Sequence, residues 1–185
     1  IMVFTLSYSS ISLYIIESKS LKLYLNSIHM TKFRSNETVK SLIQSDLSEV
    51  LVTEVSLYEV LDTNCQTLNS LNDFTFLDEL DVTIDSYHYD QNILKTISID
   101  KIQRLQSHLL KSNCLVTGQP DWGSIYISIE GETGIDSESF LKYIVSFRQH
   151  QEFHEQCVER ILMDVYRLTE SENITVYARY TRRGG

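Results

Sequence analysis

The sequence lacks an apolar run of about 18 residues, the shortest stretch that normally crosses a membrane as a helix. We therefore expect no membrane-spanning segment. Residues 1–16 are fairly apolar, but serines and tyrosines are scattered among them and they carry no basic segment. A secretory signal peptide needs such a segment, so these residues predict a strand instead.

Positive charge and paired cysteines are scarce as well. The chain has 16 Lys and Arg against 25 Asp and Glu, a formal net charge of -9. Nucleic-acid backbones are bound by clustered Lys and Arg, so we expect no nucleic-acid partner.

The three cysteines are an odd number without CxxC spacing. They predict free thiols in a reducing compartment, and hence a cytoplasmic protein.

The apolar periodicity predicts the order strand, helix, helix, strand in both halves. In the first half we expect strands over 3–16 and 52–61 and helices over 17–30 and 36–50. The second half predicts strands over 101–111, 122–130 and 173–181, a turn at 131–134, a helix capped by Asp136 and a helix over 151–169. This order indicates an α+β class, with antiparallel sheets and paired helices on one face.

The same pattern predicts the domain organisation. We expect a first module over residues 1–62 and a second over 101–185. The stretch 63–100 between them is rich in Asn, Asp, Ser and Thr, contains a short strand candidate at 82–84 and reads as a connector. Because the chain opens within a strand and stops just after two arginines, we expect it to be part of a longer protein.

The segment from His108 to Gly123 holds the first candidate for chemistry. Cys114 follows an apolar run, and Gly118 and Pro120 promote a chain reversal that can bring Asp121 back towards the thiol. A thiol beside an acid is a minimal pair of nucleophile and proton donor. The alternative is a buried small hydrophobic cysteine and a turn-capping aspartate.

The second candidate lies at the start of the helix over 151–169. His154 and Glu155 continue the apolar stripe of that helix by one turn, so both are expected on its core-facing side. A buried carboxylate needs N–H partners, which a guanine-like edge would supply. The alternatives are a solvated glutamate and a core histidine that has its own partners.

Two further clusters could bind phosphate. Residues 17–20, with the sequence ESKS, lie at a strand-to-helix junction, where hydroxyls, N–H groups and Lys19 can hold an anion. Arg179, Arg182 and Arg183 precede Gly184 near the end of the chain and could grip phosphates or remain in solvent. No GxGxxG motif follows a predicted strand, so a Rossmann dinucleotide site is not indicated.

Four blocks of this sequence resemble the NADPH-dependent 7-cyano-7-deazaguanine reductases, the nitrile reductases of queuosine biosynthesis in tRNA modification. They are ESKSLKLYLNS, SHLLKSNCLVTGQPDWGS, VSFRQHQEFHEQCVER and VYARYTRRGG, and they occur in the family's order. The resemblance is to the long form, in which two tandem tunnelling-fold (T-fold) modules each place two helices on one face of an antiparallel sheet. It also implies a homo-oligomer, with a homodimer favoured.

The resemblance implies a role for each candidate residue. Cys114 is similar to the nucleophile that attacks the nitrile carbon and forms a thioimide, and Asp121 to the proton donor. Substrate contacts are implied for Ile16, Glu17, Ser18, His154 and Glu155, and NADPH contacts for Ser18, Lys19, Arg183 and Gly184. The product would be the aminomethyl compound, and no metal is implied.

Two other functions remain open from the sequence. Cys114, His154 and Cys157 could form the Cys₂His site of a zinc-dependent cyclohydrolase of the same fold, with His154 and Cys157 one helical turn apart. A purine-binding module without catalytic activity is the other alternative.

Overall fold

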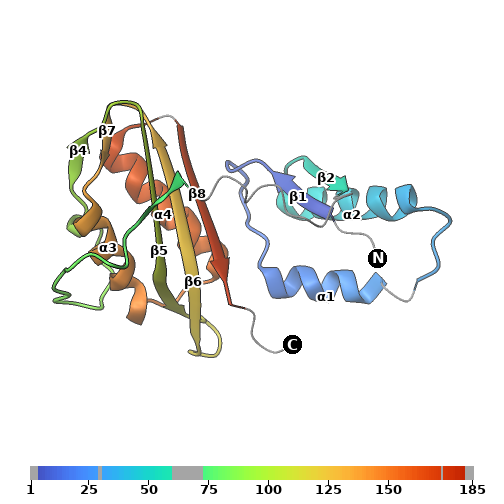
Figure 1. The fold of residues 1–185 in the computed structure, drawn as a ribbon. Coiled ribbons are helices and arrows are strands. Elements are labelled where there is room, and N and C mark those ends of the chain that lie inside the picture. The colour runs from blue at the N-terminus through green and yellow to red at the C-terminus, as the bar shows by residue number, and fades with distance from the viewer. Residues whose placement is uncertain (1–3, 29–30, 60–72, 172, 182–185) are drawn as a thin grey trace. The chain divides into compact units, whose positions relative to one another are not determined.

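The computed structural model describes residues 4–28, 31–59, 73–171 and 173–181. The chain divides into two compact units, Ile1–Ser70 and Leu71–Gly185. Figure 1 shows a mixture of helices and sheets in which most strand pairs are antiparallel. This confirms the predicted mixed class with antiparallel sheets. None of the described helices is long and apolar enough to cross a membrane.

The first unit combines a two-stranded sheet with two helices. Its elements are β1 (Phe4–Tyr8), α1 (Ser18–Ile28), α2 (Asn36–Leu51) and β2 (Val55–Glu59), and β1 pairs antiparallel with β2. The Ser35 hydroxyl caps α2 by accepting the Thr38 N–H. The core of this unit consists of five buried side chains: Ile43, Leu47, Leu51, Val55 and Leu57. No residue of α1 is fully buried.

A four-stranded sheet, in the order β3-β5-β6-β8, forms the centre of the second unit (Figure 1). Its strands are β3 (Thr75–Phe76), β5 (Ile102–Asn113), β6 (Pro120–Glu130) and β8 (Asn173–Tyr180). Only β3 runs parallel to its neighbour. A second, two-stranded sheet joins β4 (Thr96–Ser98) to β7 (Thr133–Ile135).

Two helices cover one face of this larger sheet. They are α3 (Ser137–Ser146), followed by the short 3₁₀ helix η4 (Phe147–Gln149), and α4 (His154–Thr169). Asp136 caps α3 as predicted, because its carboxylate accepts the Ser139 N–H. Apolar residues of both helices pack with the inward residues of β5 and β6 in one core.

A β-bulge in β5 decides which way the end of that strand faces. The register with β6 shifts between Ser107 and Leu110, so one extra residue lies on β5. Before the bulge Leu105 and Ser107 are buried, and after it Leu110, Ser112 and Cys114 are buried. The bulge therefore turns Cys114 towards the helix-covered face. Asp78 holds it in place by accepting the Ser107 hydroxyl at 2.6 Å and the His108 N–H at 2.9 Å.

Some predicted elements are wrong. The strand over 3–16 ends at Tyr8, because Ser9 starts a turn in which its hydroxyl accepts the Ile11 N–H and its carbonyl accepts the Ser12 N–H. Ile11 and Leu13, which alternate as on one face of a strand, are exposed. Residues 82–84 form no strand, and β7 overlaps the predicted turn and continues to Ile135.

The stretch predicted as a connector is partly packed into the second unit. Leu77 and Leu94 are buried members of its core, and η3 (Gln91–Ile93) and β4 are ordered elements of this stretch. Residues 63–72 lie outside the described residues.

Candidate active site

The candidate residues of the second unit gather at one end of the four-stranded sheet. Cys114 directly follows β5, Asp121 is the second residue of β6, and His154 begins α4. Asp121 lies directly opposite Ser112 in the β5–β6 ladder, and Cys114 lies two residues beyond Ser112 on the same buried face. The chain reversal inferred from Gly118 and Pro120 is thus present.

A tight loop fixes the backbone at Cys114. The Cys114 N–H donates to the Gln119 carbonyl at 2.9 Å, and the Gly118 N–H donates to the Cys114 carbonyl at 2.8 Å. Gly118 has φ +65°, a left-handed conformation that glycine adopts without steric cost. Cys114 is a buried thiol and is only 2% exposed. The nucleophile candidate is therefore held in a preformed loop.

Backbone hydrogen bonds bring the start of α4 to the same place. The Asn113 N–H donates to the His150 carbonyl at 2.8 Å, and the Glu152 N–H donates to the Asn113 carbonyl at 3.2 Å. The Lys111 ammonium adds a bond of 2.6 Å to the Arg148 carbonyl. The segment that leads into α4 is thus tied to the residue immediately before Cys114.

A short contact joins two of the candidate residues. Nε2 of His154 lies 3.0 Å from Oδ2 of Asp121. The Asp121 side chain is 2% exposed, whereas that of His154 is 28% exposed, so the imidazole connects a buried carboxyl group with solvent. Glu155 follows in the first turn of α4 and is partly buried. His154 and Glu155 are therefore at the helix start, as expected.

Sequence reasoning assigned no site role to Tyr180, although it follows Ile174, Val176 and Ala178 at alternate positions of β8. Its ring stacks on the His154 imidazole with a centroid distance of 3.9 Å and an interplanar angle of 2°. Its hydroxyl lies by the Cys157 thiol and the Ser112 hydroxyl. Burial raises the pKa of Tyr180 well above its usual value, and the nearby Cys157 and Asp121 raise it further. Burial likewise raises the pKa of Cys157 to about 11, so its thiol stays protonated at neutral pH.

The candidate residues of the first unit lie at the start of α1. The Glu17 carboxylate accepts the N–H groups of Lys19 and Ser20 at 2.9 and 2.8 Å. Partial burial would raise the pKa of Glu17, but these hydrogen bonds outweigh it and lower the pKa. The prediction that these N–H groups are available to a phosphate is therefore wrong, because the preceding carboxylate already occupies them.

The remaining candidates of this unit differ in exposure. Ile16 is partly buried, and its N–H donates to the Tyr8 hydroxyl at 3.3 Å. Ser18 is partly buried and Lys19 is exposed, so a hydroxyl and an ammonium group lie at the helix start. Both groups suit an anionic phosphate. The other two cofactor candidates, Arg183 and Gly184, belong to the second unit and lie outside the described residues.

The zinc alternative finds no support in the geometry. Across the described ranges, no group of three or more His, Cys, Asp or Glu side chains is arranged to hold a metal ion.

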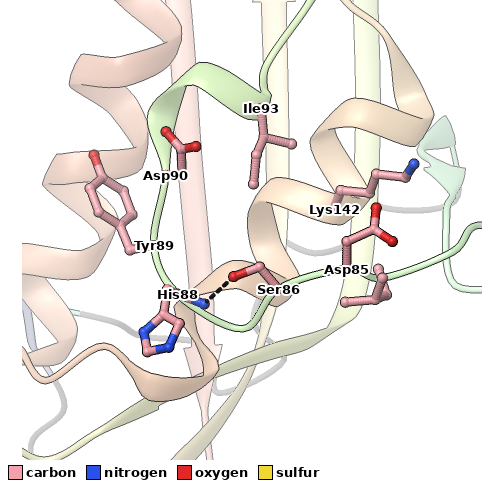
Figure 2. Close-up of a pocket in the computed structure, with 8 residues that line it drawn as sticks. Asp85, Ser86, His88, Tyr89, Asp90, Ile93 and Lys142 are labelled. Atoms are coloured by element: carbon pink, nitrogen blue, oxygen red, sulfur yellow. Dashed lines mark hydrogen bonds between the residues drawn. The ribbon is translucent and has the colours of Figure 1, made fainter.

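A groove of about 440 Å³ opens elsewhere on the second unit, and none of the candidate residues lines it. Figure 2 shows Asp85, Ser86, His88 and Asp90 around it, with Lys142 contributed by α3.

A buried thiol and a buried carboxylic acid on one sheet face, with an imidazole against the acid, are the groups of an enzyme that uses a covalent nucleophile. Comparison with known proteins agrees. The model for "QueF-like protein" matches residues 120–185, and the model for "Nitrile reductase, 7-cyano-7-deazaguanine-reductase N-term" matches residues 1–58. The chain belongs to this family of nitrile reductases.

A curated relative extends the comparison through the region between the two matches. It is the NADPH-dependent 7-cyano-7-deazaguanine reductase of Legionella pneumophila (strain Lens), 49% identical to this chain over 182 residues. The alignment covers 97% of this chain and 64% of the relative, so the chain spans less than two thirds of that protein.

Proposed function

We propose that this chain is part of an enzyme that reduces the nitrile of 7-cyano-7-deazaguanine to an aminomethyl group with two equivalents of NADPH, in queuosine biosynthesis. The observation that carries the proposal is the arrangement of Cys114 and Asp121. Both are almost fully buried on the helix-covered face of one hairpin, and His154 contacts the acid. The 49% identity to a reductase of this name supports the same substrate and cofactor.

Cys114 acts as the nucleophile in this proposal. Its S–H bond breaks as the sulfur bonds to the nitrile carbon. The nitrile nitrogen takes a proton from Asp121, and the thiol proton passes to the Asp121 carboxylate, which gives a neutral thioimide. A nitrile carbon is a soft electrophile, and a thiolate is a matching soft nucleophile. NADPH, when bound, would supply the two hydrides that turn this carbon into the aminomethyl carbon, and the carbon–sulfur bond would break so that the Cys114 thiol is regenerated. His154 orients the Asp121 carboxyl group and connects it with solvent.

The other candidate residues bind the two reactants. Glu155 accepts N–H groups of the guanine-like edge, next to His154, and Ile16, Glu17 and Ser18 form a second strip of substrate contacts. Ser18 and Lys19 hold the cofactor together with Arg183 and Gly184. The exposed ammonium group of Lys19 and the hydroxyl of Ser18 support this assignment, because both suit phosphate oxygens.

We propose the same organisation for the fold as for the family. Two tandem T-fold modules would occupy residues 1–62 and 101–185, joined by residues 63–100, and the protein would be a cytoplasmic homo-oligomer, with a homodimer favoured, without a nucleic-acid partner. The antiparallel β5–β6–β8 sheet covered by α3 and α4 supports the second module. Light scattering coupled to size exclusion would measure the subunit number.

Intact mass spectrometry tests the proposed chemistry. Protein incubated with 7-cyano-7-deazaguanine without NADPH should gain the mass of one substrate, and peptide mapping should find it on Cys114 and not on Cys157. Cys114→Ala should abolish the mass gain. Asp121→Asn should slow turnover more than it weakens substrate binding. An unchanged mass of the folded wild-type protein would refute the role of Cys114, and stoichiometric zinc would favour the cyclohydrolase alternative.

A further inference from the structure

The end of β8 contacts the candidate site through one aromatic side chain. Tyr180 lies flat on the His154 ring, with centroids 3.9 Å apart and planes within 2° of parallel. On its other side the backbone of Tyr180 pairs with Gly123 of β6, two residues after Asp121. The phenol ring therefore touches the imidazole whose Nε2 meets the carboxylate of Asp121.

Gly123 makes room for this ring. A Cβ at position 123 would lie 3.1 and 3.3 Å from Cδ1 and Cε1 of Tyr180 and 3.0 Å from the Arg179 carbonyl oxygen. A side chain at position 123 would therefore press on the Tyr180 ring, which would have to shift by a few tenths of an ångström. The glycine lets the phenol ring lie across β6, towards the end of the sheet where α4 begins.

The far end of the phenol is buried as well. The Tyr180 hydroxyl is fully buried and lies by the thiol of Cys157, one turn after His154 on α4, and by the hydroxyl of Ser112, opposite Asp121 on β5. The ring is thus fixed at its Cα by the β8–β6 ladder, and its far end is enclosed by the neighbouring strand and helix. The phenol ring therefore packs against one face of the imidazole.

The orientation of the imidazole plane depends on such packing. Rotation about the bond that joins an imidazole to its Cβ has broad minima, so packing must define the ring plane. His154 is the first residue of α4 and is 28% exposed, so solvent borders part of its ring. Without the phenol ring the imidazole could turn its Nε2 away from Asp121 while the helix stayed in place.

We propose that Tyr180 is a positioning residue that holds the His154 ring so that Nε2 meets Asp121, and that Gly123 serves the same arrangement by leaving space for the phenol ring. The expected effect on catalysis rests on the proposed function, whereas the effect on the position of the His154 ring does not. The part played by Tyr180 is steric and comes from its ring, so a phenylalanine should replace it and an aliphatic side chain should not.

The test compares Tyr180→Leu and Tyr180→Phe in the full-length protein. Tyr180→Leu should slow single-turnover nitrile reduction roughly 10- to 100-fold, because small misplacements of a proton-transfer group are costly. It should also change the pH profile of that step, while adduct formation on Cys114 persists. Tyr180→Phe should retain most of the wild-type rate and pH profile. Equal losses in both variants would assign the effect to the hydroxyl and overturn the proposal.

Tyr177→Leu is the matched control. Tyr177 is on the same strand but on the opposite face, where it packs against Tyr126 and is 41% exposed. This variant should leave rate and pH profile unchanged, and a slowing equal to that of Tyr180→Leu would indicate a general defect in β8. Gly123→Ala should change the rate and pH profile in the same direction as Tyr180→Leu but less, because its Cβ presses on the same ring without removing it.

A spectroscopic readout separates this inference from the proposed function. The ¹⁵N shift of His154 Nε2 reports its contact with Asp121 whether or not the protein reduces a nitrile. It should move in Tyr180→Leu and Gly123→Ala but not in Tyr180→Phe or Tyr177→Leu. Unchanged shifts in all four variants would refute the positioning role. A wild-type protein that forms no adduct, but shows these shifts, would refute only the proposed function.

Discussion

The two units of this chain differ in the length of their strands and in the polar side chains that they bury. The strands of β1 and β2 have five residues each, whereas β5 and β6 have 12 and 11. Among the described residues, every buried polar or charged side chain lies in the second unit, including Asp121 and Asp164. The first unit keeps its carboxylates, such as those of Glu17 and Asp46, partly in contact with solvent.

This difference explains where the candidate chemistry can be placed. A buried carboxylate is costly unless its partners are held firmly, and only a well-packed scaffold can hold them. In the second unit the Asp121 carboxyl group sits within such a scaffold, between β5 and α4. The start of α1 in the first unit offers an exposed Lys19 and a capping carboxylate, which suits reversible binding better than proton transfer.

The largest contrast should appear on truncating one buried leucine in each unit. Leu110 and Leu51 are both 0% exposed, and each belongs to the core of its unit. We expect Leu110→Ala to lower the free energy of unfolding by about 4 kcal/mol and Leu51→Ala by about 2.5 kcal/mol, because a small core relaxes more easily around a cavity. Urea denaturation, with hydrogen exchange to assign each transition to a unit, would measure both losses.

Equal losses would show that the core of the first unit is as rigid as that of the second. The comparison drawn from strand length and burial would then fail. A single transition for both units would likewise show that they do not unfold separately.

The sequence predicted the elements with strong periodicity. The helices α2 and α4 and the strands β5, β6 and β8 lie within a few residues of their predicted bounds, and Asp136 caps α3. Short elements were missed: β3 and β4 have two or three residues, too few for a period to be recognised. Ile11 and Leu13 alternate as in a strand, but Ser9 redirects the chain before they can pair.

The sequence likewise predicted some features of the candidate site and missed others. Gly118 and Pro120 predicted the chain reversal between Cys114 and Asp121, because turn residues determine the backbone conformation locally. The bulge that turns Cys114 inward depends on Asp78, which is distant in sequence, and the stack of Tyr180 on His154 joins β8 to α4. No local pattern encodes such contacts. The alternation of Tyr180 along β8 was the one available signal.

A second contrast compares two carboxylates whose pKa values are both lowered. Burial alone would raise the pKa of Glu152, but Arg160, at 2.9 and 2.6 Å, and His150, at 2.8 Å, lower it. At pH 7 we expect Glu152→Gln to cost about 2 kcal/mol of unfolding free energy, because Arg160 loses a well-shielded partner. Glu17→Gln should cost about 0.5 kcal/mol, because it weakens only an exposed helix cap.

The pH dependence of these two variants follows from the direction of the shifts. A carboxyl group with a lowered folded-state pKa stabilises the protein above its unfolded pKa of about 4.3, and this stabilisation disappears as the pH falls towards the folded value. Denaturation of each variant and the wild type between pH 7 and pH 3 should therefore show the differences shrinking below about pH 4. A Glu152→Gln difference that grows on acidification would contradict the assignment.

The smallest contrast concerns the same hydrogen bond in two surroundings. The Tyr143 hydroxyl donates to the buried Asp164 at 2.7 Å, and the Tyr24 hydroxyl donates to the half-buried Asp46 at 2.6 Å. Water can replace a phenol at Asp46 but not at Asp164. We expect Tyr143→Phe to cost about 1.5 kcal/mol and Tyr24→Phe about 0.5 kcal/mol of unfolding free energy near pH 7.

Burial and these carboxylates raise the pKa of both tyrosines, so each bond stabilises the folded state most fully below the unfolded pKa of about 10 and progressively less above it. The two variants should therefore approach the wild type in stability as the pH rises beyond that value, with the larger change for Tyr143→Phe. Denaturation curves at pH 7 and pH 11 would measure it. If Tyr24→Phe proved the more costly, the geometry of the bond and not its burial would decide its strength, and the contrast between the two units would lose its physical basis.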